Sequence, residues 1–277
     1  MAHTVLITGA TSGIGLATAR ALAERGWNVL LHGRTQEKAA QAAADLAGGR
    51  VTPVAGDLAD FDAIRQLAAT VRAEHPPLDV LVNNAGVWNS HRELTATGIE
   101  KTLAVNHLAY FLLTGLLHDH LRPHARILCL ASDSHRQVRG MRFDDLSLAD
   151  NYHGLRAYAQ SKLANVLFCY EYDRRKRGQR SICAIQPGLV QTDIGLKGNT
   201  WLHRLAWRVR RQMSGHKTAA EGAATTVFLA TVADQPPSGL YWDGGKPKRS
   251  YSSSYDEGEA RRLWKVSEEL TGFAFTP

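Results

Sequence analysis

Seven short apolar runs, rich in leucine and β-branched residues, recur along the chain, separated by longer stretches in which apolar residues follow a helical period. The runs lie at residues 4–8, 27–33, 50–56, 78–84, 125–132, 181–187 and 239–244. Such alternation demands parallel strands joined by right-handed crossovers, with helices on both faces of the sheet. The pattern predicts an α/β fold with a doubly wound parallel sheet of about seven strands.

The chain shows no internal repeat, no low-complexity linker and no break in composition, so residues 1–277 are expected to form a single domain. The regular alternation of strand-like and helical patterns is weakest in two segments, around 133–155 and around 193–216. In doubly wound folds, ligands bind at loops beyond the carboxyl ends of the strands. Both segments are therefore candidate walls of a site, the first as an extended loop and the second as a variable substrate loop.

A hydrophobic content of 44% and a charged content of 21% are typical of a globular protein with a sizeable core. No apolar run approaches the ~20 residues of a membrane span, and a strand begins almost at residue 1, which leaves no room for a signal peptide. Cys129, Cys169 and Cys183 lie in apolar segments, where thiols behave as small hydrophobes. We expect a cytoplasmic protein with reduced, structural thiols.

The formal net charge of +7 raises the question of a nucleic-acid partner. Lys and Arg are spread along the chain without a nucleic-acid motif, so an anionic cofactor is a sufficient explanation and no nucleic acid is expected. Twelve histidines invite a metal site, and His118 and His120 are closest in sequence. Because no zinc-type spacing of Cys and His occurs, no metal is predicted.

The segment TGATSGIG, residues 8–15, follows the first predicted strand and opens the first predicted helix. Gly9 allows a tight turn, Gly13 lets the backbone approach a pyrophosphate, and Gly15 lets helix and strand pack closely, while the helix N-terminus attracts phosphates. This arrangement is typical of the dinucleotide-binding Rossmann fold, and a glycine-rich turn without a ligand is the alternative. The candidate contacts in this turn are Gly9, Thr11, Ser12, Gly13, Ile14 and Gly15.

The end of the second predicted strand favours NADP(H) as the cofactor. An NAD enzyme would normally carry an acid there to bind the ribose 2′-hydroxyl, whereas this chain has Gly33 followed by Arg34. A guanidinium can grip a 2′-phosphate, and no carboxylate opposes it. A surface arginine without a ligand is the alternative, and Ser12 stands where a second basic residue would precede Gly13.

Tyr158 and Lys162 lie one helical turn apart in the stretch RAYAQSKLANVLF, residues 156–168, and so share one helix face. The pair is either a surface feature with a snorkelling lysine, or a proton donor beside the charge that lowers its pKa. One helical turn alone favours the first interpretation. The choice between the two depends on the rest of the chain.

Several further motifs occur in a characteristic order. They are GDL at 56–58, NNAG at 83–86, VNHLAYFLLT at 105–114, a serine after the fifth strand, YAQSK at 158–162 and QPGLVQT at 186–192. With the glycine turn they resemble the short-chain dehydrogenase/reductase family over nearly the whole chain. SKLANVLF, HKTAAEGAATT and ARRLWKVSEEL are similar to the branch of retinol dehydrogenases, WW-domain oxidoreductases and protochlorophyllide reductase, whose substrates are often lipophilic.

The resemblance implies a catalytic tetrad of Asn106, Ser132, Tyr158 and Lys162. Tyr158 would be the acid/base, because a nearby ammonium and an oxidised nicotinamide both favour the phenolate. Lys162 would also bond the nicotinamide ribose, and Asn106 would hold a water of the proton relay unless it merely caps or kinks its helix. Ser132 would bond the substrate oxygen, although the long segment before Tyr158 keeps Ser134 as an alternative.

The resemblance also implies further cofactor contacts at three positions of the site. They are Asp57 and Leu58 near the adenine, Asn84, Ala85 and Gly86 on the ribose side, and Pro187, Gly188, Val190 and Thr192 around the carboxamide. Asn83 and Asn84 are open to a second interpretation as turn formers after a strand.

These features predict an NADP(H)-dependent carbonyl reductase or alcohol dehydrogenase, which transfers a hydride between the nicotinamide and a lipophilic small-molecule carbonyl or alcohol. The alternative is a catalytically silent NADP(H)-binding scaffold or regulatory protein, which would have no chemical use for the tetrad. The family often dimerises through the helices bearing Asn106 and Tyr158, so a homodimer is a further expectation. The extra residues before Tyr158 can block that assembly.

The 193–216 segment contains WLHRLAWRVRRQM, in which apolar residues recur at helical spacing among arginines. They are Trp201, Leu202, Leu205, Val209 and Met213. Peripheral membrane contact is one interpretation, and packing on the protein itself is the more common one. As an apolar lid over the nicotinamide, the segment would exclude water and bury substrate carbon, so bulky hydrophobic carbonyl compounds are expected to be better substrates than small polar sugars.

Overall fold

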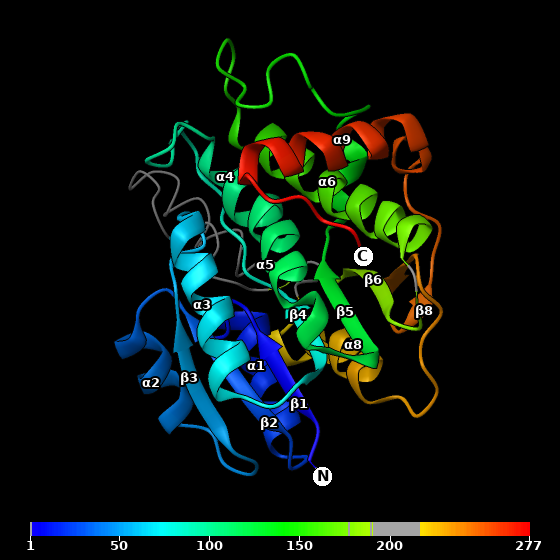
Figure 1. The fold of residues 1–277 in the computed structure, drawn as a ribbon. Coiled ribbons are helices and arrows are strands. Elements are labelled where there is room, and N and C mark those ends of the chain that lie inside the picture. The colour runs from blue at the N-terminus through cyan, green and yellow to red at the C-terminus, as the bar shows by residue number, and fades with distance from the viewer. Residues whose placement is uncertain (1, 177, 189, 191–216) are drawn as a thin grey trace.

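The computed structural model describes residues 2–176, 178–188, 190 and 217–277. Within these residues, an eight-stranded sheet runs in the order β3-β2-β1-β4-β5-β6-β7-β8 (Figure 1). The strands are β1 (Thr4–Ile7), β2 (Asn28–Gly33), β3 (Val51–Ala55), β4 (Leu78–Asn83), β5 (Leu121–Leu130), β6 (Ser181–Gln186), β7 (Leu240–Asp243) and β8 (Lys246–Pro247). All neighbours pair in parallel except β8, which turns back along β7. The predicted doubly wound parallel sheet is confirmed, with short β8 added at its edge.

Helices cover both faces of the sheet. One face carries α1 (Gly13–Ala23), α2 (Gln36–Ala44) and α8 (Ala219–Thr231). The other carries α3 (Phe61–Glu74), α5 (Ala109–Leu117) and α6 (Gly154–Arg175) (Figure 1). The short α4 (Lys101–Leu103) leads into α5 through a π-helical turn, Ala104–Leu108, and α9 (Glu257–Thr271) packs on α6. Short 3-10 turns lie at His118–His120, Asp133–Gln137 and Ser252–Tyr255.

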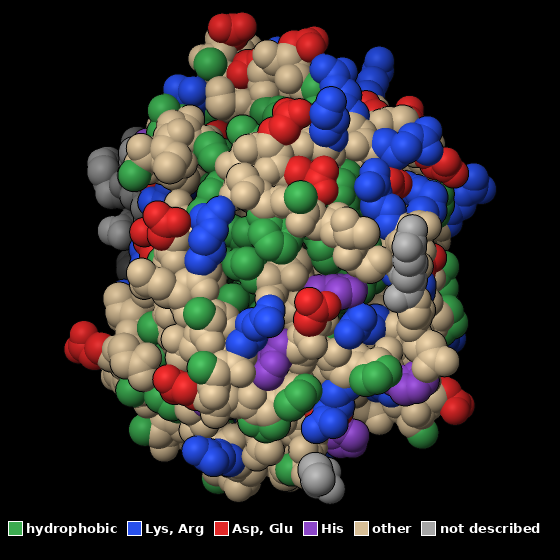
Figure 2. Space-filling model, viewed as in Figure 1, with side chains coloured by type: hydrophobic (Ala, Val, Ile, Leu, Met, Phe, Trp, Pro, Cys, Tyr) green, Lys and Arg blue, Asp and Glu red, His purple; other side chains and the backbone are tan. Residues whose placement is uncertain are grey.

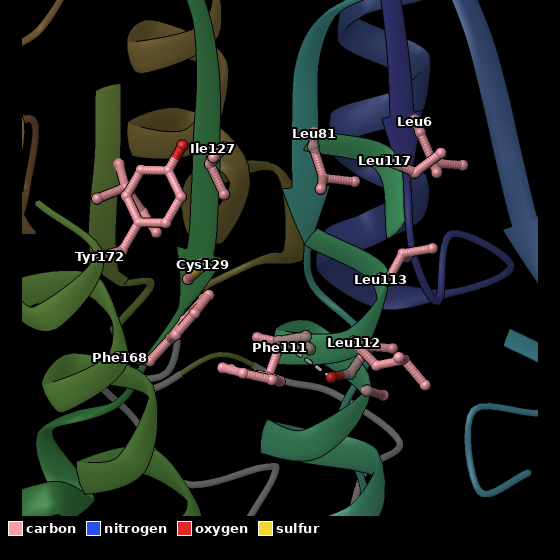
Figure 3. Packing of buried hydrophobic residues seen from close by; sticks show 14 of the residues in the cluster. Leu6, Leu81, Phe111, Leu112, Leu113, Leu117, Ile127, Cys129, Phe168 and Tyr172 are labelled. Carbon is pink, nitrogen blue, oxygen red and sulfur yellow. Dashed lines mark hydrogen bonds between the residues drawn. The ribbon is translucent and has the colours of Figure 1, made fainter. Parts of the chain in front are cut away.

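Burial on both faces explains why the strands are continuous apolar runs. All residues of β1 are buried, and successive side chains of a strand point to opposite faces. Val5 therefore joins the core beneath α1 with Leu22, whereas Leu6 joins the opposite core with Leu81 and Phe111 (Figure 3). Each helical layer thus has its own apolar cluster, and the sheet separates the two.

The C-terminal helix α9 packs on α6 and covers it from solvent. Trp264 of α9 stacks on Phe168 of α6 with ring centroids 5.8 Å apart, and Phe275 stacks on Trp264 at 5.2 Å. Every residue from 159 to 172 of α6 is buried. Along this part of its length, α6 has no exposed face.

The extended loop predicted around 133–155 is held against the segment that follows β4. The Arg92 guanidinium donates to the Ser147 backbone oxygen at 3.1 Å and to its hydroxyl at 3.0 Å. The Tyr152 hydroxyl donates to a carboxylate oxygen of Glu100 at 3.2 Å. Since Glu100 also caps the N-terminus of α4 through two backbone N–H groups, the loop is tied to the helix that carries Asn106.

The surface and the thiols add three observations. Cys129, Cys169 and Cys183 are buried and form no disulfide. Among the helices of the described ranges, none combines the length and apolar content needed to cross a membrane. On the face seen in Figure 2, basic and acidic side chains are interspersed.

Candidate active site

The carboxyl ends of six neighbouring strands meet along one edge of the sheet. The chain leaves β1 for β2 on one side and leaves β3 for β4 on the other, so the strand order reverses between β1 and β4. Ligands of doubly wound folds bind in the crevice at such a switch point. Just beyond these strand ends lie the predicted residues Gly9, Arg34, Asp57, Asn84, Ser132 and Pro187.

The glycine turn has the backbone that the sequence predicts. Gly9 and Gly13 have φ of +63° and +58°, in the region that favours glycine. A Cβ on Gly15 would lie 2.6 Å from the Gly9 carbonyl oxygen, so only glycine allows this packing. Ser12 precedes α1 without capping it through its side chain, which leaves the first N–H groups of α1 available to an anion. The turn therefore fits a dinucleotide pyrophosphate.

Two polar side chains brace the glycine turn against β4. The Thr8 hydroxyl accepts from the backbone N–H groups of Asn84 and Ala85 at 2.9 and 3.0 Å. In return, the Asn84 amide donates to the carbonyl oxygens of Thr8 and Gly9 at 2.7 and 3.2 Å. The Asn84 side chain thus stabilises the turn itself, a role that the sequence analysis missed. Gly86 follows directly and is half-buried.

A buried histidine that sequence reasoning missed connects the glycine turn to β3. His32, 2% exposed, accepts from the Gly9 backbone N–H through Nδ1 at 3.1 Å and donates through Nε2 to the Gly56 carbonyl oxygen at 3.0 Å. Burial lowers the pKa of His32 to about 4, so the imidazole is neutral, as these two bonds require. The only signal in the sequence was a polar residue near the end of an apolar run.

Arg34 is exposed directly after β2. A Cβ on neighbouring Gly33 would lie 2.8 Å from the Thr11 side chain, which places the start of the Arg34 segment beside the glycine turn. Beyond β3, an Asp57 carboxylate oxygen accepts from the Ala59 backbone N–H at 3.0 Å, and Leu58 is buried in the core. These residues line the β2 and β3 end of the crevice.

Tyr158 and Ser132 meet at the end of β5. Tyr158 lies in the first turns of α6, and its hydroxyl is near enough to the Ser132 side chain to interact with it. Burial raises the pKa of Tyr158 to about 12, and the interaction with Ser132 opposes that rise. The Ser134 hydroxyl instead lies 2.5 Å from that of Ser132. Of the two serines, Ser132 is the one that interacts with the phenol.

Lys162 lies one helical turn beyond Tyr158 and is 3% exposed. Its ammonium donates to the Leu130 carbonyl oxygen at 2.8 Å and stands 5.5 Å from the centroid of the Tyr158 ring. Burial lowers the pKa of Lys162 to about 7. This burial excludes the snorkelling surface lysine considered from the sequence.

Asn106 lies in the π-helical turn before α5 and is fully buried. Its amide oxygen accepts from the Val87 backbone N–H at 2.7 Å, and its amide nitrogen donates to the Val87 carbonyl oxygen and the Ser161 hydroxyl, both at 3.0 Å. The side chain is therefore engaged in joining the segment after β4 to α6. The prediction that Asn106 holds a water of the proton relay stays a prediction.

The segment after β6 lies against the start of α1 and α8. Gly188 has φ of +90°, and a Cβ there would lie 2.8 Å from the side chain of Lys217, a residue that sequence reasoning missed. Val190 pairs with Lys217, and a Cβ on Gly222 would meet both Val190 and Ile14. Thr192 and the 193–216 segment, including its predicted lid and membrane contact, lie outside the described residues.

The crevice and the cluster around Tyr158 define the class of protein: an oxidoreductase with a nucleotide site on a doubly wound sheet. The model of the family described as short chain dehydrogenase matches residues 3–144, and the chain belongs to this family. Human retinol dehydrogenase 13 is 38% identical over 97% of this chain and 84% of its own length. WW domain-containing oxidoreductase from Danio rerio is 35% identical over 99% of this chain and 69% of its own. The predicted branch is thereby confirmed.

Solved structures agree with this assignment. A crystal structure of a Mycobacterium paratuberculosis protein is 32% identical, with a TM-score of 0.79 over 99% of this chain and 94% of that one. A Burkholderia cenocepacia short chain dehydrogenase in complex with NADP is 26% identical, with a TM-score of 0.66 over 87% of this chain and 96% of that one. The family and these neighbours support a nicotinamide cofactor. In the described ranges, no group of His, Cys, Asp and Glu could hold a metal ion.

Proposed function

We propose that this protein is an NADP(H)-dependent carbonyl reductase or alcohol dehydrogenase for a lipophilic small molecule. The observation that carries the proposal is the Tyr158 phenol, which interacts with Ser132 and lies next to the buried Lys162 ammonium, on the same crevice as a turn that fits a dinucleotide. A phenol in this setting can exchange a proton with a substrate oxygen. Asn106, Ser132, Tyr158 and Lys162 form the catalytic site of the proposal.

The bound cofactor would supply or accept the hydride at its nicotinamide. During reduction, the Tyr158 hydroxyl donates a proton to the carbonyl oxygen, and during oxidation the phenolate accepts it from the alcohol. Ser132 positions that oxygen, because its hydroxyl already stands at the phenol. The Lys162 ammonium, 5.5 Å from the centroid of the Tyr158 ring, would stabilise the phenolate when it forms.

The preference for the 2′-phosphate form rests on Arg34. Its guanidinium is exposed directly after β2, on the strand where NAD enzymes place an acid. The structural neighbour from Burkholderia carries NADP, which supports the same choice. The remaining predicted contacts, from the glycine turn to Val190 and Thr192, belong to this proposal.

A lipophilic substrate is supported by the relatives, whose names include retinol dehydrogenase 13 and retinol dehydrogenase 12. The test is steady-state kinetics of NADPH oxidation on aldehydes and ketones of increasing carbon number, with small polar sugars as the comparison. We expect kcat/KM to rise with added carbons, because apolar surface is buried. Efficiency that stays flat or falls would reject an apolar substrate pocket.

The competing function is a silent NADP(H)-binding scaffold. A scaffold has no use for a phenol placed between a serine and a buried ammonium, since burying that ammonium costs free energy. NADPH binding without turnover of any carbonyl or alcohol tested would favour the scaffold over the enzyme.

The proposal also covers the domain organisation, the oligomeric state and the cellular compartment of the protein. We infer a single dehydrogenase domain over residues 1–277 and a cytoplasmic protein, since three buried free thiols fit a reducing compartment. A homodimer is not expected to use α6, because α9 encloses that helix. Size-exclusion chromatography with light scattering tests the assembly, and cell fractionation tests the location.

A further inference from the structure

A series of buried hydrogen bonds runs from α9 to the carbonyl that holds Lys162. The Leu130 carbonyl oxygen accepts from Lys162 Nζ at 2.8 Å and from Asn165 Nδ2 at 3.1 Å. Asn165 Oδ1 lies 3.4 Å from His107 Nδ1, and His107 Nε2 lies 3.0 Å from the Ser267 hydroxyl. Asn165, His107 and Ser267 are each 0% exposed. Residues from β5, α6, the π-helical turn and α9 thus meet beneath Lys162.

The chemistry of the partners assigns a direction to each bond. Burial lowers the pKa of His107 to about 4, although its bond to Asn165 opposes this, so the ring is neutral and carries one N–H. The Asn165 amide must turn its nitrogen to Leu130, because a carbonyl only accepts. Its oxygen therefore faces His107, and Nδ1 of that ring must be the donor. Nε2 can then only accept, so the single proton of the Ser267 hydroxyl, which also lies 2.8 Å from the Leu263 carbonyl oxygen, has to turn toward His107.

We propose that Asn165 and His107 are positioning residues for Lys162, acting through the Leu130 carbonyl. The inference rests on the proposed function only in giving Lys162 its catalytic task. The Leu130 carbonyl oxygen accepts from both Asn165 and Lys162. The bond from Asn165 fixes the position of this oxygen, and the oxygen in turn fixes the position of the Lys162 ammonium. The His107 N–H selects the amide orientation, since a flipped amide would set its oxygen against the Leu130 oxygen.

The π-helical turn explains how neighbouring residues reach two points around Lys162. Asn106 donates to Ser161, which directly precedes Lys162, while the next residue, His107, contacts Asn165 one turn further along α6. The extra residue in such a turn re-aims the side chains that it carries. Burying these polar groups costs free energy unless each is paired, and an apolar filling would avoid that cost. The presence of these paired polar groups beside the ammonium favours a role in placing it.

A matched pair of substitutions tests the positioning. The amide nitrogen of asparagine can occupy the position of histidine Nδ1, whereas that of glutamine can reach the position of Nε2. His107→Asn thus keeps the donor to Asn165, and His107→Gln loses it. We expect NADPH affinity and kcat within about twofold of wild type for His107→Asn and roughly tenfold lower for His107→Gln. Equal losses in the two variants, at similar melting temperatures, would overturn the positioning role.

A double substitution separates this role from simple packing. If His107 acts through Asn165, His107→Gln adds little once Asn165→Leu has removed the amide, so the two effects are not additive. Independent, additive losses would contradict the proposal. Both variants are first compared with wild type by thermal melting, so that a folding defect is recognised.

A measurement without cofactor or substrate keeps the outcome distinct from that of the proposed function. The side-chain NMR signal of Lys162 in nitrogen-labelled protein is assigned by its loss in Lys162→Met. We expect this signal to shift in His107→Gln and Asn165→Leu and to stay in place in His107→Asn. An unmoved signal in all three variants would reject the inference. Absence of NADPH binding or turnover in wild type would reject the proposed function alone.

Discussion

The Ser132 side chain interacts with the Tyr158 phenol, although the whole extended loop separates the two residues in sequence. The loop leaves β5 after Ser132 and returns at the start of α6, so its length does not disturb the pairing of strand end and helix. Two hydrogen bonds, from Arg92 to Ser147 and from Tyr152 to Glu100, hold the loop against the segment that follows β4.

Tyr158→Phe is expected to reduce turnover strongly and retain NADPH binding, because only the phenolic proton donor is removed. General acid catalysis contributes a factor of about 10²–10⁴ to the rate, so kcat should decrease by a factor within that range. Steady-state kinetics and fluorescence titration with NADPH measure the two effects. Tyr255→Phe, at a 44% exposed tyrosine, is the matched control and should keep wild-type rates. Activity within a few-fold of wild type in Tyr158→Phe would remove the phenol from the mechanism.

Ser132→Ala should reduce kcat far more than Ser134→Ala, because the Ser132 hydroxyl contacts the phenol and the Ser134 hydroxyl contacts only Ser132 among these groups. We expect a loss of about 10²-fold for Ser132→Ala and a few-fold for Ser134→Ala. Each variant serves as the control of the other, since both delete one hydroxyl from the same turn. The reverse order would transfer the role to Ser134.

Arg34→Ala should narrow the preference for NADPH over NADH. A charge-assisted bond to a phosphate contributes about 1.5–3 kcal/mol, so the ratio of the two kcat/KM values should fall by at least about tenfold. Arg25→Ala, an exposed change beyond the other end of α1, is the control. Equal use of both cofactors by the wild type would refute the assigned preference.

Stability should decline as the pH falls from about 6.5 to about 4. His32 and His107 are buried, and their pKa values are lowered from 6.5 to about 4 in the folded chain. The unfolded chain therefore binds protons across this interval and the folded chain does not, which decreases the free energy of unfolding by about 3 kcal/mol per histidine. Urea unfolding at a series of pH values measures the slope. His107→Asn should make it shallower, and an unchanged slope would exclude His107 as a contributor.

The order of apolar runs in the sequence determined the doubly wound sheet, because parallel strands buried on both faces leave a local signature that needs no long-range information. The glycine turn was likewise readable, since Gly9 and Gly13 adopt backbone angles that other residues avoid. Tyr158 and Lys162 were found through one helical spacing and the order of motifs around it. The eighth strand was missed because two residues, Lys246 and Pro247, are too short to show a period.

Only the tertiary structure decided which polar groups meet. The sequence assigned the serine role to Ser132 and left Ser134 as an alternative, and the direction in which β5 ends sets Ser132 against Tyr158. His32 shows no pattern in the sequence, because its partners Gly9 and Gly56 come from other strands. Hydrogen bonds between distant segments depend on distances and angles that only the packed sheet and helices establish, and residue order along one chain does not encode them locally.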